Sequence, residues 1–146
     1  MFRPRRLLVP VDLAPGAEKA VRAAAGLARA SGGRLLLLHV FDSRAVEDIY
    51  NLHGLKEQEV RARMKANAEE ALGKLLRRAW MQGVATTVRY VDGFPPDTIV
   101  ATAKSWRADL LVLARRRRSG LSHLLYGRTS DAVVREAPCA VLTLAP

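Results

Sequence analysis

A run of arginines directly follows the apolar stretch "LLVLA" and carries the clearest chemistry in the sequence. Arg115 to Arg118 stand together, and Arg128 comes shortly afterwards. A guanidinium group presents N–H donors in a planar fork that fits the oxygens of a phosphate. Gly127, Arg128 and Thr129 are predicted to open a helix, whose first N–H groups also attract anions. The stretch is therefore predicted to bind a phosphate or another anion, with a solvated basic loop as the alternative.

Asp12 is a second candidate, because it follows the apolar stretch "RLLVPV". Its carboxylate would accept hydrogen bonds from a hydroxyl or an exocyclic amine of a ligand. The alternative is a structural aspartate at the beginning of a helix, stabilised by the helix dipole. Position in the sequence does not separate these two interpretations.

The remaining reactive side chains are interpreted as structural. His39 lies inside an apolar run with no Cys or carboxylate at metal-ligand spacing, so we expect a core histidine and no zinc site. His53 and His123 are isolated, and no Ser-His-Asp arrangement can be argued from the sequence. Cys139 precedes an apolar run and is interpreted as a buried thiol rather than a nucleophile.

A sheet must position these residues, since five short apolar runs alternate with helical patterns. Strands that are apolar on both faces indicate an α/β fold with a parallel sheet covered by helices on both sides. Such sheets bind ligands at the carboxyl ends of their strands, where Asp12 and Arg115 stand. Residues 42–56 are predicted to form a connector with at most one helical turn. Strands are predicted at 6–11, 34–41, 84–91, 109–114 and 140–145, and helices at 15–33, 57–82, 95–107 and 129–136.

The composition narrows the classes of protein and partner. Hydrophobic residues make up 49% of the 146 residues, which is typical of one globular domain, here 1–146. The formal net charge of +10 favours an anionic partner: a nucleotide, a nucleic acid or an acidic surface. Aromatic residues make up only 5%, so there is little sign of base stacking. Without a membrane-spanning run or a signal peptide, and with a single cysteine, the chain is expected to be cytoplasmic with no membrane partner.

Three stretches, "VPVD", "SGLSHLLYG" and "EAPCAVL", together resemble the universal stress protein family, and the similarity runs through nearly the whole chain. The resemblance implies a single Rossmann-like α/β domain, with a five-stranded parallel sheet in the order 3-2-1-4-5 and helices on both faces. It also implies a homodimer paired through the last strand, Ala140–Leu144. The family contains members that bind ATP and members that do not.

Members that bind ATP carry G-x-x-G followed further along by G-[ST], and this chain departs from that pattern. The glycine positions fall at Ala114, Arg117 and Gly127, and the hydroxyl position falls at Arg128, with Thr129 next. If the position of Arg117 needs a left-handed backbone, its side chain costs about 1–2 kcal/mol. Either charge-assisted hydrogen bonds from the arginines offset that loss, or the arginines close the site and serve another anion.

The resemblance thus divides a nucleotide site into two halves. Its adenosine side is assigned to Pro10, Val11, Asp12 and Val40. Its phosphate or anion side is assigned to Ala114, Arg115, Arg117, Arg118, Ser119, Gly120, Gly127, Arg128 and Thr129. No catalytic residue and no resident metal is assigned, and Mg²⁺ is expected only if ATP binds.

These observations favour a non-enzymatic, stress-related regulatory module. It would be dimeric, with an adapted or weakened site for ATP, AMP or another small anion. The alternative is an ATP-independent member whose basic face binds a protein or a nucleic acid. A slow ATPase comes last, since no residue after a strand is an evident general base and no Mg²⁺-holding pair can be named.

Overall fold

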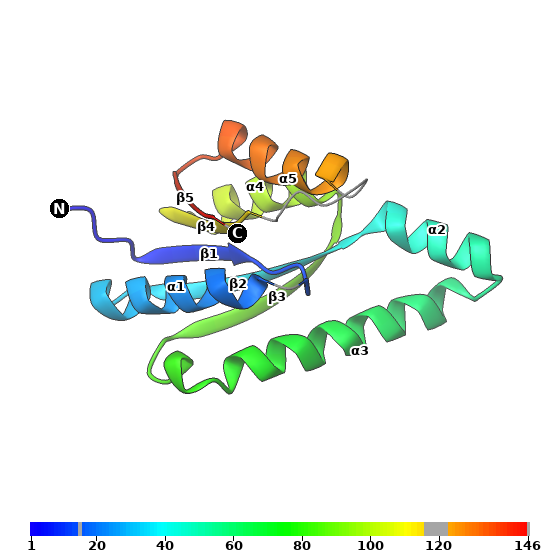
Figure 1. The fold of residues 1–146 in the computed structure, drawn as a ribbon, viewed down its shortest axis with the longest axis horizontal. Helices are drawn as coiled ribbons and strands as arrows, with labels where there is room; N and C mark the ends of the chain where they lie inside the picture. Colours follow the sequence, from blue (N-terminus) through cyan, green and yellow to red (C-terminus); the bar gives the residue numbers. More distant parts are fainter. Residues whose placement is uncertain (15, 116–122, 146) are drawn as a thin grey trace.

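Strands and helices alternate along the chain and build one parallel sheet (Figure 1). The computed structural model describes residues 1–14, 16–115 and 123–145, and only the backbone of 123–128. The sheet has the order β3-β2-β1-β4-β5, which confirms the expected fold. The strands are β1 (Arg6–Pro10), β2 (Arg34–Asp42), β3 (Thr86–Gly93), β4 (Leu110–Ala114) and β5 (Ala140–Leu144). The helices are α1 (Ala17–Ser31), α2 (Ser43–His53), α3 (Glu57–Leu76), a short 3₁₀ turn η1 (Ala79–Met81), α4 (Pro95–Ser105) and α5 (His123–Glu136).

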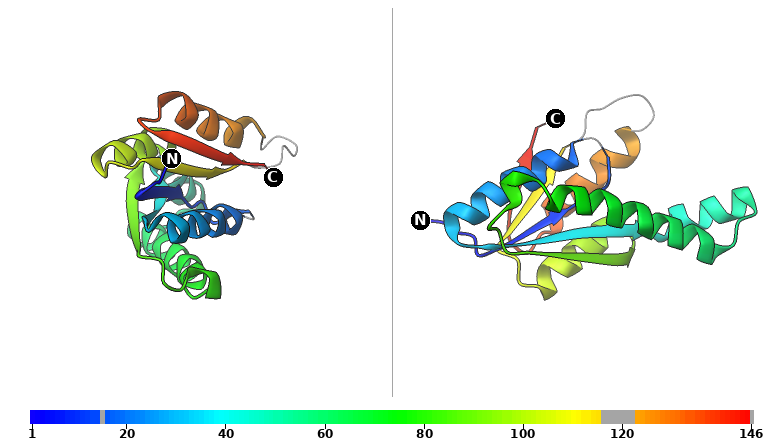
Figure 2. Two further views of the ribbon diagram at one scale, coloured as in Figure 1. Left: turned by 90° about the vertical axis from the view of Figure 1, so that its left-hand side faces the viewer. Right: turned by 90° about the horizontal axis from the view of Figure 1, so that it is seen from below.

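Two apolar cores form, one on each face of the sheet. Successive strand residues point to opposite faces, so Leu7 and Val9 of β1 join one core and Leu8 joins the other. The first core packs against α1 and α3, and the second packs against α4 and α5 (Figure 2). Burial on both faces explains why these strands read as continuous apolar runs rather than as alternating patterns.

The pairing between β1 and β4 is short. Within the described residues, the two strands pair only through Leu7 with Leu110 and Leu8 with Leu111. Alternate residues of a parallel strand bond to opposite neighbours. Because the N–H of Val11 donates to the Leu38 oxygen of β2 at 2.8 Å, position 10 faces β4. Pro10 has no N–H to donate, so the ladder to β4 ends before it.

The connector predicted at 42–56 is wrong, because it contains the eleven-residue helix α2. The Asp42 side chain caps this helix by accepting a hydrogen bond from the Arg44 N–H at 3.0 Å. Val46, Ile49 and Tyr50 do follow helical spacing in the sequence, although only Val46 of the helix is buried. Together with the adjoining part of α3, the helix extends beyond the end of the sheet (Figure 2).

Two other helix boundaries also differ from the prediction. The helix predicted at 57–82 ends at Leu76, where a short turn and η1 take over so that Trp80 packs against the first core. The last helix begins at His123, six residues before the predicted start at Thr129. Gly127 suggested a break in the sequence, but the helix continues through it.

Candidate functional site

The loop after β1 holds Asp12 in a defined turn. The Ala14 N–H donates to Asp12 Oδ1 at 3.2 Å, which closes a local turn of the chain. Leu13 has a φ of 53°, a left-handed conformation that a side chain of this kind rarely adopts. Helix α1 begins only at Ala17, with Gly16 as its N-cap. The interpretation of Asp12 as a helix-start residue is therefore wrong, because the helix begins five residues later.

The end of β2 lies beside this loop. Pro10 is the register partner of Leu38, and the Val11 N–H carries the pairing one residue further. Val40 lies two residues beyond Leu38 in β2, and its register partner in β3 is Val91. Val40 is half-buried and packs against the second core, whereas Val11 is buried in the first. Pro10, Val11 and Asp12 thus follow one another at the end of β1, whereas Val40 lies on the neighbouring strand β2 and packs on the opposite face of the sheet from Val11.

His39 is a core histidine, as predicted. Its side chain is 9% exposed, and its Nδ1 lies 2.6 Å from the Val11 backbone oxygen. A carbonyl oxygen only accepts, so Nδ1 carries the hydrogen and ties the end of β2 to the loop after β1. The edge of the Phe41 ring lies against the histidine, with ring centroids 4.9 Å apart. Among the described residues, no three His, Cys, Asp or Glu side chains are grouped to hold a metal ion.

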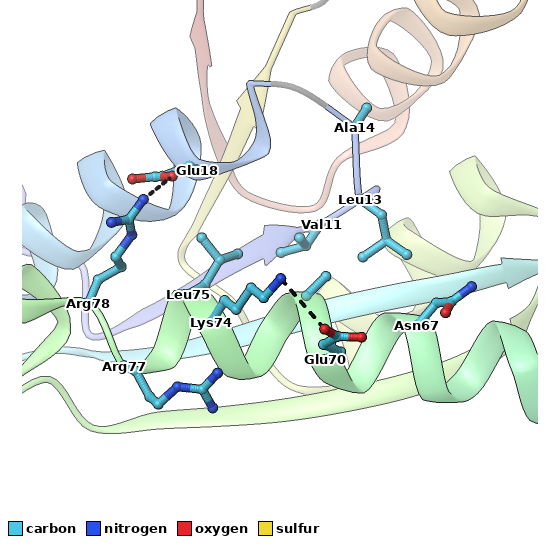
Figure 3. Close-up of a pocket in the computed structure, with 11 residues that line it drawn as sticks. Val11, Leu13, Ala14, Glu18, Asn67, Glu70, Lys74, Leu75, Arg77 and Arg78 are labelled. Carbon is cyan, nitrogen blue, oxygen red and sulfur yellow. Dashed lines mark hydrogen bonds and ion pairs between the residues drawn. The ribbon is translucent and has the colours of Figure 1, made fainter.

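A cleft of about 760 Å³ opens between the loop after β1 and helix α3 (Figure 3). Among the described residues, Val11 is the only lining residue that was also predicted for the site. Two ion pairs form between residues that line the cleft. Lys74 Nζ lies 3.6 Å from Glu70 Oε1 within α3, and Arg78 Nη2 lies 3.0 Å from Glu18 Oε2 of α1. The lining residues are Val11, Leu13, Ala14, Glu18, Asn67, Glu70, Ala71, Lys74, Leu75, Arg77 and Arg78. Sequence reasoning missed this wall, although Asn67, Ala71, Lys74 and Arg78 follow helical spacing beside the apolar face of α3.

The phosphate side is described only in part. Ala114 is half-buried and pairs with Leu144, and the exposed Arg115 extends the ladder by donating its N–H to the Leu144 oxygen at 2.9 Å. Arg115 also lines a second hollow of about 420 Å³ with residues of α5 and β5. Arg116, Arg117, Arg118, Ser119 and Gly120 lie outside the described residues, and of Gly127 and Arg128 only the backbone is described.

The helix start predicted at Gly127 to Thr129 is wrong. Helix α5 begins at His123, so Thr129 lies in its second turn. There the backbone N–H belongs to the helical hydrogen-bond ladder and is not directed outward. Any anion bound beside Thr129 would have to be held by side chains rather than by a helix N-terminus.

Cys139 lies half-buried against the second core. Burial raises the pKa of its thiol, the charge of Asp109 raises it further, and a backbone hydrogen bond with Leu111 lowers it. A raised pKa keeps the thiol protonated at neutral pH, and the protonated form is a poor nucleophile. The geometry therefore fits a packing residue.

Comparisons with known proteins agree on one family. A family model described as the Universal stress protein family matches residues 4–144. A universal stress protein of Methanocaldococcus jannaschii is 26% identical over 96% of this chain and 81% of its own length. A putative universal stress protein of Staphylococcus aureus is 27% identical over 99% of this chain and 86% of its own length.

Solved structures share the fold. The hypothetical protein MJ0577 superposes with a TM-score of 0.81 at 20% identity, over 99% of this chain and 98% of that one. A universal stress protein in complex with cAMP gives 0.69 at 22% identity, covering 98% of both chains. A universal stress protein from Archaeoglobus fulgidus in complex with dAMP gives 0.66 at 19% identity, over 97% of this chain and 98% of that one. No helix within the described residues is long and apolar enough to span a membrane.

Proposed function

Since this chain belongs to the universal stress protein family, we propose that it is a non-enzymatic regulatory module that binds an adenine nucleotide. The site would lie at the carboxyl ends of β1 and β2. One observation carries the proposal: the pairing of β1 with β4 ends at Leu8, shortly before the loop that contains Asp12. Open α/β sheets bind their ligands at such points of strand-order reversal. The structural relatives in complex with cAMP and dAMP support the choice of nucleotide.

The adenosine side combines apolar contact with one fixed carboxylate. Val11 lines the cleft along α3 and would pack against the base, whereas Val40 packs on the other face of the sheet and would contribute only at the end of β2. Asp12 is exposed, and its turn aims the carboxylate from a loop that also contains the left-handed Leu13. Rare backbone conformations of this kind cluster at ligand sites, where surrounding structure maintains them. Asp12 would accept a hydrogen bond from a ribose hydroxyl or from the amine of the base.

Replacing Asp12 with alanine should weaken nucleotide binding by about 1–3 kcal/mol, because a hydrogen bond to a charged acceptor is lost. Asp12→Asn keeps the acceptor of the local turn and should lose less. Asp48→Ala, at an exposed position of α2, removes one negative charge elsewhere and should leave the affinity unchanged. Isothermal titration with AMP and with ATP measures all three variants. An unchanged affinity of Asp12→Ala for both nucleotides would refute the proposed adenosine side.

The phosphate side of the proposed site is adapted rather than typical of the family. Arg115 is exposed at the carboxyl end of β4, and more arginines follow it in the sequence. We propose that Arg115, Arg117, Arg118 and Arg128 hold the phosphates by charge-assisted hydrogen bonds, where ATP-binding relatives use glycine backbone. Such a site would favour nucleotides with more phosphates. Mg²⁺ would accompany ATP only.

Pairing of two copies through β5 is also part of the proposal. Both outer strands have one unpaired side within the described residues. β3 carries Arg89 and Asp92, and charges of this kind discourage strand addition. β5, with the sequence AVLTL, carries no charge. An uncharged strand edge is open to pairing with a second copy and therefore favours a homodimer. Separately, the single cysteine supports a reducing, cytoplasmic location for the protein.

Sedimentation should give a mass near twice 16.0 kDa at micromolar concentration. Thr143→Lys places a charge at an exposed position of the β5 edge and should shift the protein to a monomer. Thr87→Lys makes the same change at an exposed position of β3 and should leave the dimer intact. A monomeric wild-type protein, or a monomer produced only by Thr87→Lys, would contradict pairing through β5.

A further inference from the structure

The opposite edge of the sheet, where the strands begin, carries a cluster of arginines. Arg34 pairs in register with Arg6, and its N–H donates to the Arg5 oxygen at 2.9 Å. The Asp109 N–H donates to the Arg6 oxygen at 2.9 Å, which brings the turn containing Arg107 against the start of β1. The cluster therefore spans the starts of three adjacent strands, β2, β1 and β4. We call Arg3, Arg5, Arg6, Arg34 and Arg107 the amino-edge arginines, and all five are exposed.

Their charge is not neutralised by ion pairs. The carboxylate of Asp109 lies at this edge, but both of its oxygens accept backbone hydrogen bonds from Arg5 and Arg6, at 2.9 to 3.1 Å. In the part of the chain that the structure describes, none of the amino-edge arginines forms an ion pair with a carboxylate. Arg6 and Arg34 stand directly opposite each other, an arrangement that is destabilising for like charges. A bound polyanion would convert this repulsion into attraction.

Two of the guanidinium groups are already held in place. Arg5 Nη1 donates to the Ser31 oxygen at 3.3 Å, and Arg6 Nη1 donates to the Trp106 oxygen at 2.8 Å. The Arg6 guanidinium also lies 6.0 Å above the centre of the Trp106 ring. Each guanidinium has five N–H donors, so these contacts leave donors for a ligand while reducing the entropy lost on binding.

We propose that the amino-edge arginines bind the phosphate backbone of a double-stranded nucleic acid without reading its sequence. A duplex carries a negative charge about every 1.7 Å along its axis, a high charge density that attracts lysine and arginine side chains. Neighbouring strands lie about 4.8 Å apart, so starts on three strands place positive charges across about 10 Å. Arg6 covers a face of Trp106, which leaves the ring poorly placed to stack on bases. The surface therefore suits phosphates rather than base edges.

The test compares two triple variants that each remove three positive charges from the formal +10 of the chain. The edge variant is Arg3→Gln, Arg34→Gln and Arg107→Gln, which avoids the two arginines bonded to backbone oxygens. The control variant is Arg22→Gln, Arg63→Gln and Arg89→Gln, at exposed positions of α1, α3 and β3. Fluorescence anisotropy with a labelled 20-base-pair duplex is measured at several salt concentrations, for DNA and for RNA. Thermal unfolding checks that both variants are folded.

The edge variant should bind the duplex at least about tenfold more weakly at low salt. Each lost phosphate contact also reduces the slope of log K against log salt by about 0.9, so the edge variant should lose about two to three in slope. The control variant should change its affinity less than about threefold. Equal DNA and RNA affinity would leave the backbone assignment intact, since both duplexes present the same phosphates.

Four results would overturn the proposal. Equal losses in both variants would mean that only the net charge matters. A loss confined to a third variant, Arg115→Gln, Arg116→Gln and Arg118→Gln, would assign binding to the arginine run after β4. No duplex binding by the wild-type protein would exclude a nucleic acid altogether. Binding to anionic lipid vesicles instead would assign this edge, where Phe2 is 61% exposed, to a membrane surface.

Discussion

Leu36→Ala should lower the free energy of unfolding by about 2–5 kcal/mol, the usual loss when a leucine is truncated in a close-packed core. Leu36 lies in β2, near the middle of the sheet, and is 0% exposed. Its register partners are Leu8 and Thr87, and it belongs to the core covered by α4 and α5. Strands on both sides prevent the backbone from closing over the cavity. Chemical denaturation with a constant m-value measures the loss.

Leu52→Ala is the matched control for this change. Leu52 lies on α2 and is 79% exposed, so truncation removes the same atoms without creating a cavity. The free energy of unfolding should stay within about 0.5 kcal/mol of the wild type, as for most surface substitutions. Similar losses for both variants would mean that the core on this face of the sheet is not close-packed.

Gly33→Ala should destabilise the protein by about 1–3 kcal/mol, the cost of forcing an atom into packed surroundings. Gly33 lies in the turn between α1 and β2. A Cβ atom there would stand 2.6 Å from the Pro4 backbone oxygen and 3.0 Å from Leu7 Cδ1. The first contact is with backbone, which cannot swing aside as a long side chain would. Relief requires a movement of the segment that leads into β1.

Gly26→Ala makes the same substitution where there is room. Gly26 lies inside α1, and a Cβ atom would meet nothing within 4 Å. Alanine favours a helix over glycine by about 1 kcal/mol, so this variant should be more stable than the wild type. Thermal unfolding of the two variants should therefore shift the midpoint in opposite directions. Shifts of the same sign would contradict the close approach at Gly33.

The strands were predictable because burial on both faces leaves a strong mark on the sequence. The leucines of β2 and the Leu110–Ala114 run are short, continuously apolar and flanked by polar residues, which is typical of strands buried on both faces. The order of the strands did not follow from these runs, since pairing depends on residues far apart in the chain. It was supplied by the motifs that resemble a known family, and the structure confirms it.

The parts that sequence reasoning missed depend on contacts that leave little pattern. Helix α2 carries only a short apolar stripe, Val46, Ile49 and Tyr50, and buries Val46 alone, so it lacks the long buried stripe that marks α1. The wall of the cleft on α3 is polar, and its importance arises because it faces the loop after β1. The helix start at Thr129 was misplaced because Gly127 suggested a break, although a helix tolerates an interior glycine at a modest cost.

The short pairing between β1 and β4 also bears on how the molecule moves. Beyond Leu8 and Leu111, no backbone ladder joins the two strands within the described residues. Moving the carboxyl ends of β1 and β4 apart would break no backbone hydrogen bond between these two strands. The free-energy cost would come mainly from lost side-chain packing. The two groups of strands, β3-β2-β1 and β4-β5, are thus joined by backbone pairing only at the amino ends of β1 and β4. A ligand that contacts both groups of strands at their carboxyl ends would therefore hold β1 and β4 at a fixed separation while leaving the pairing within each group unchanged.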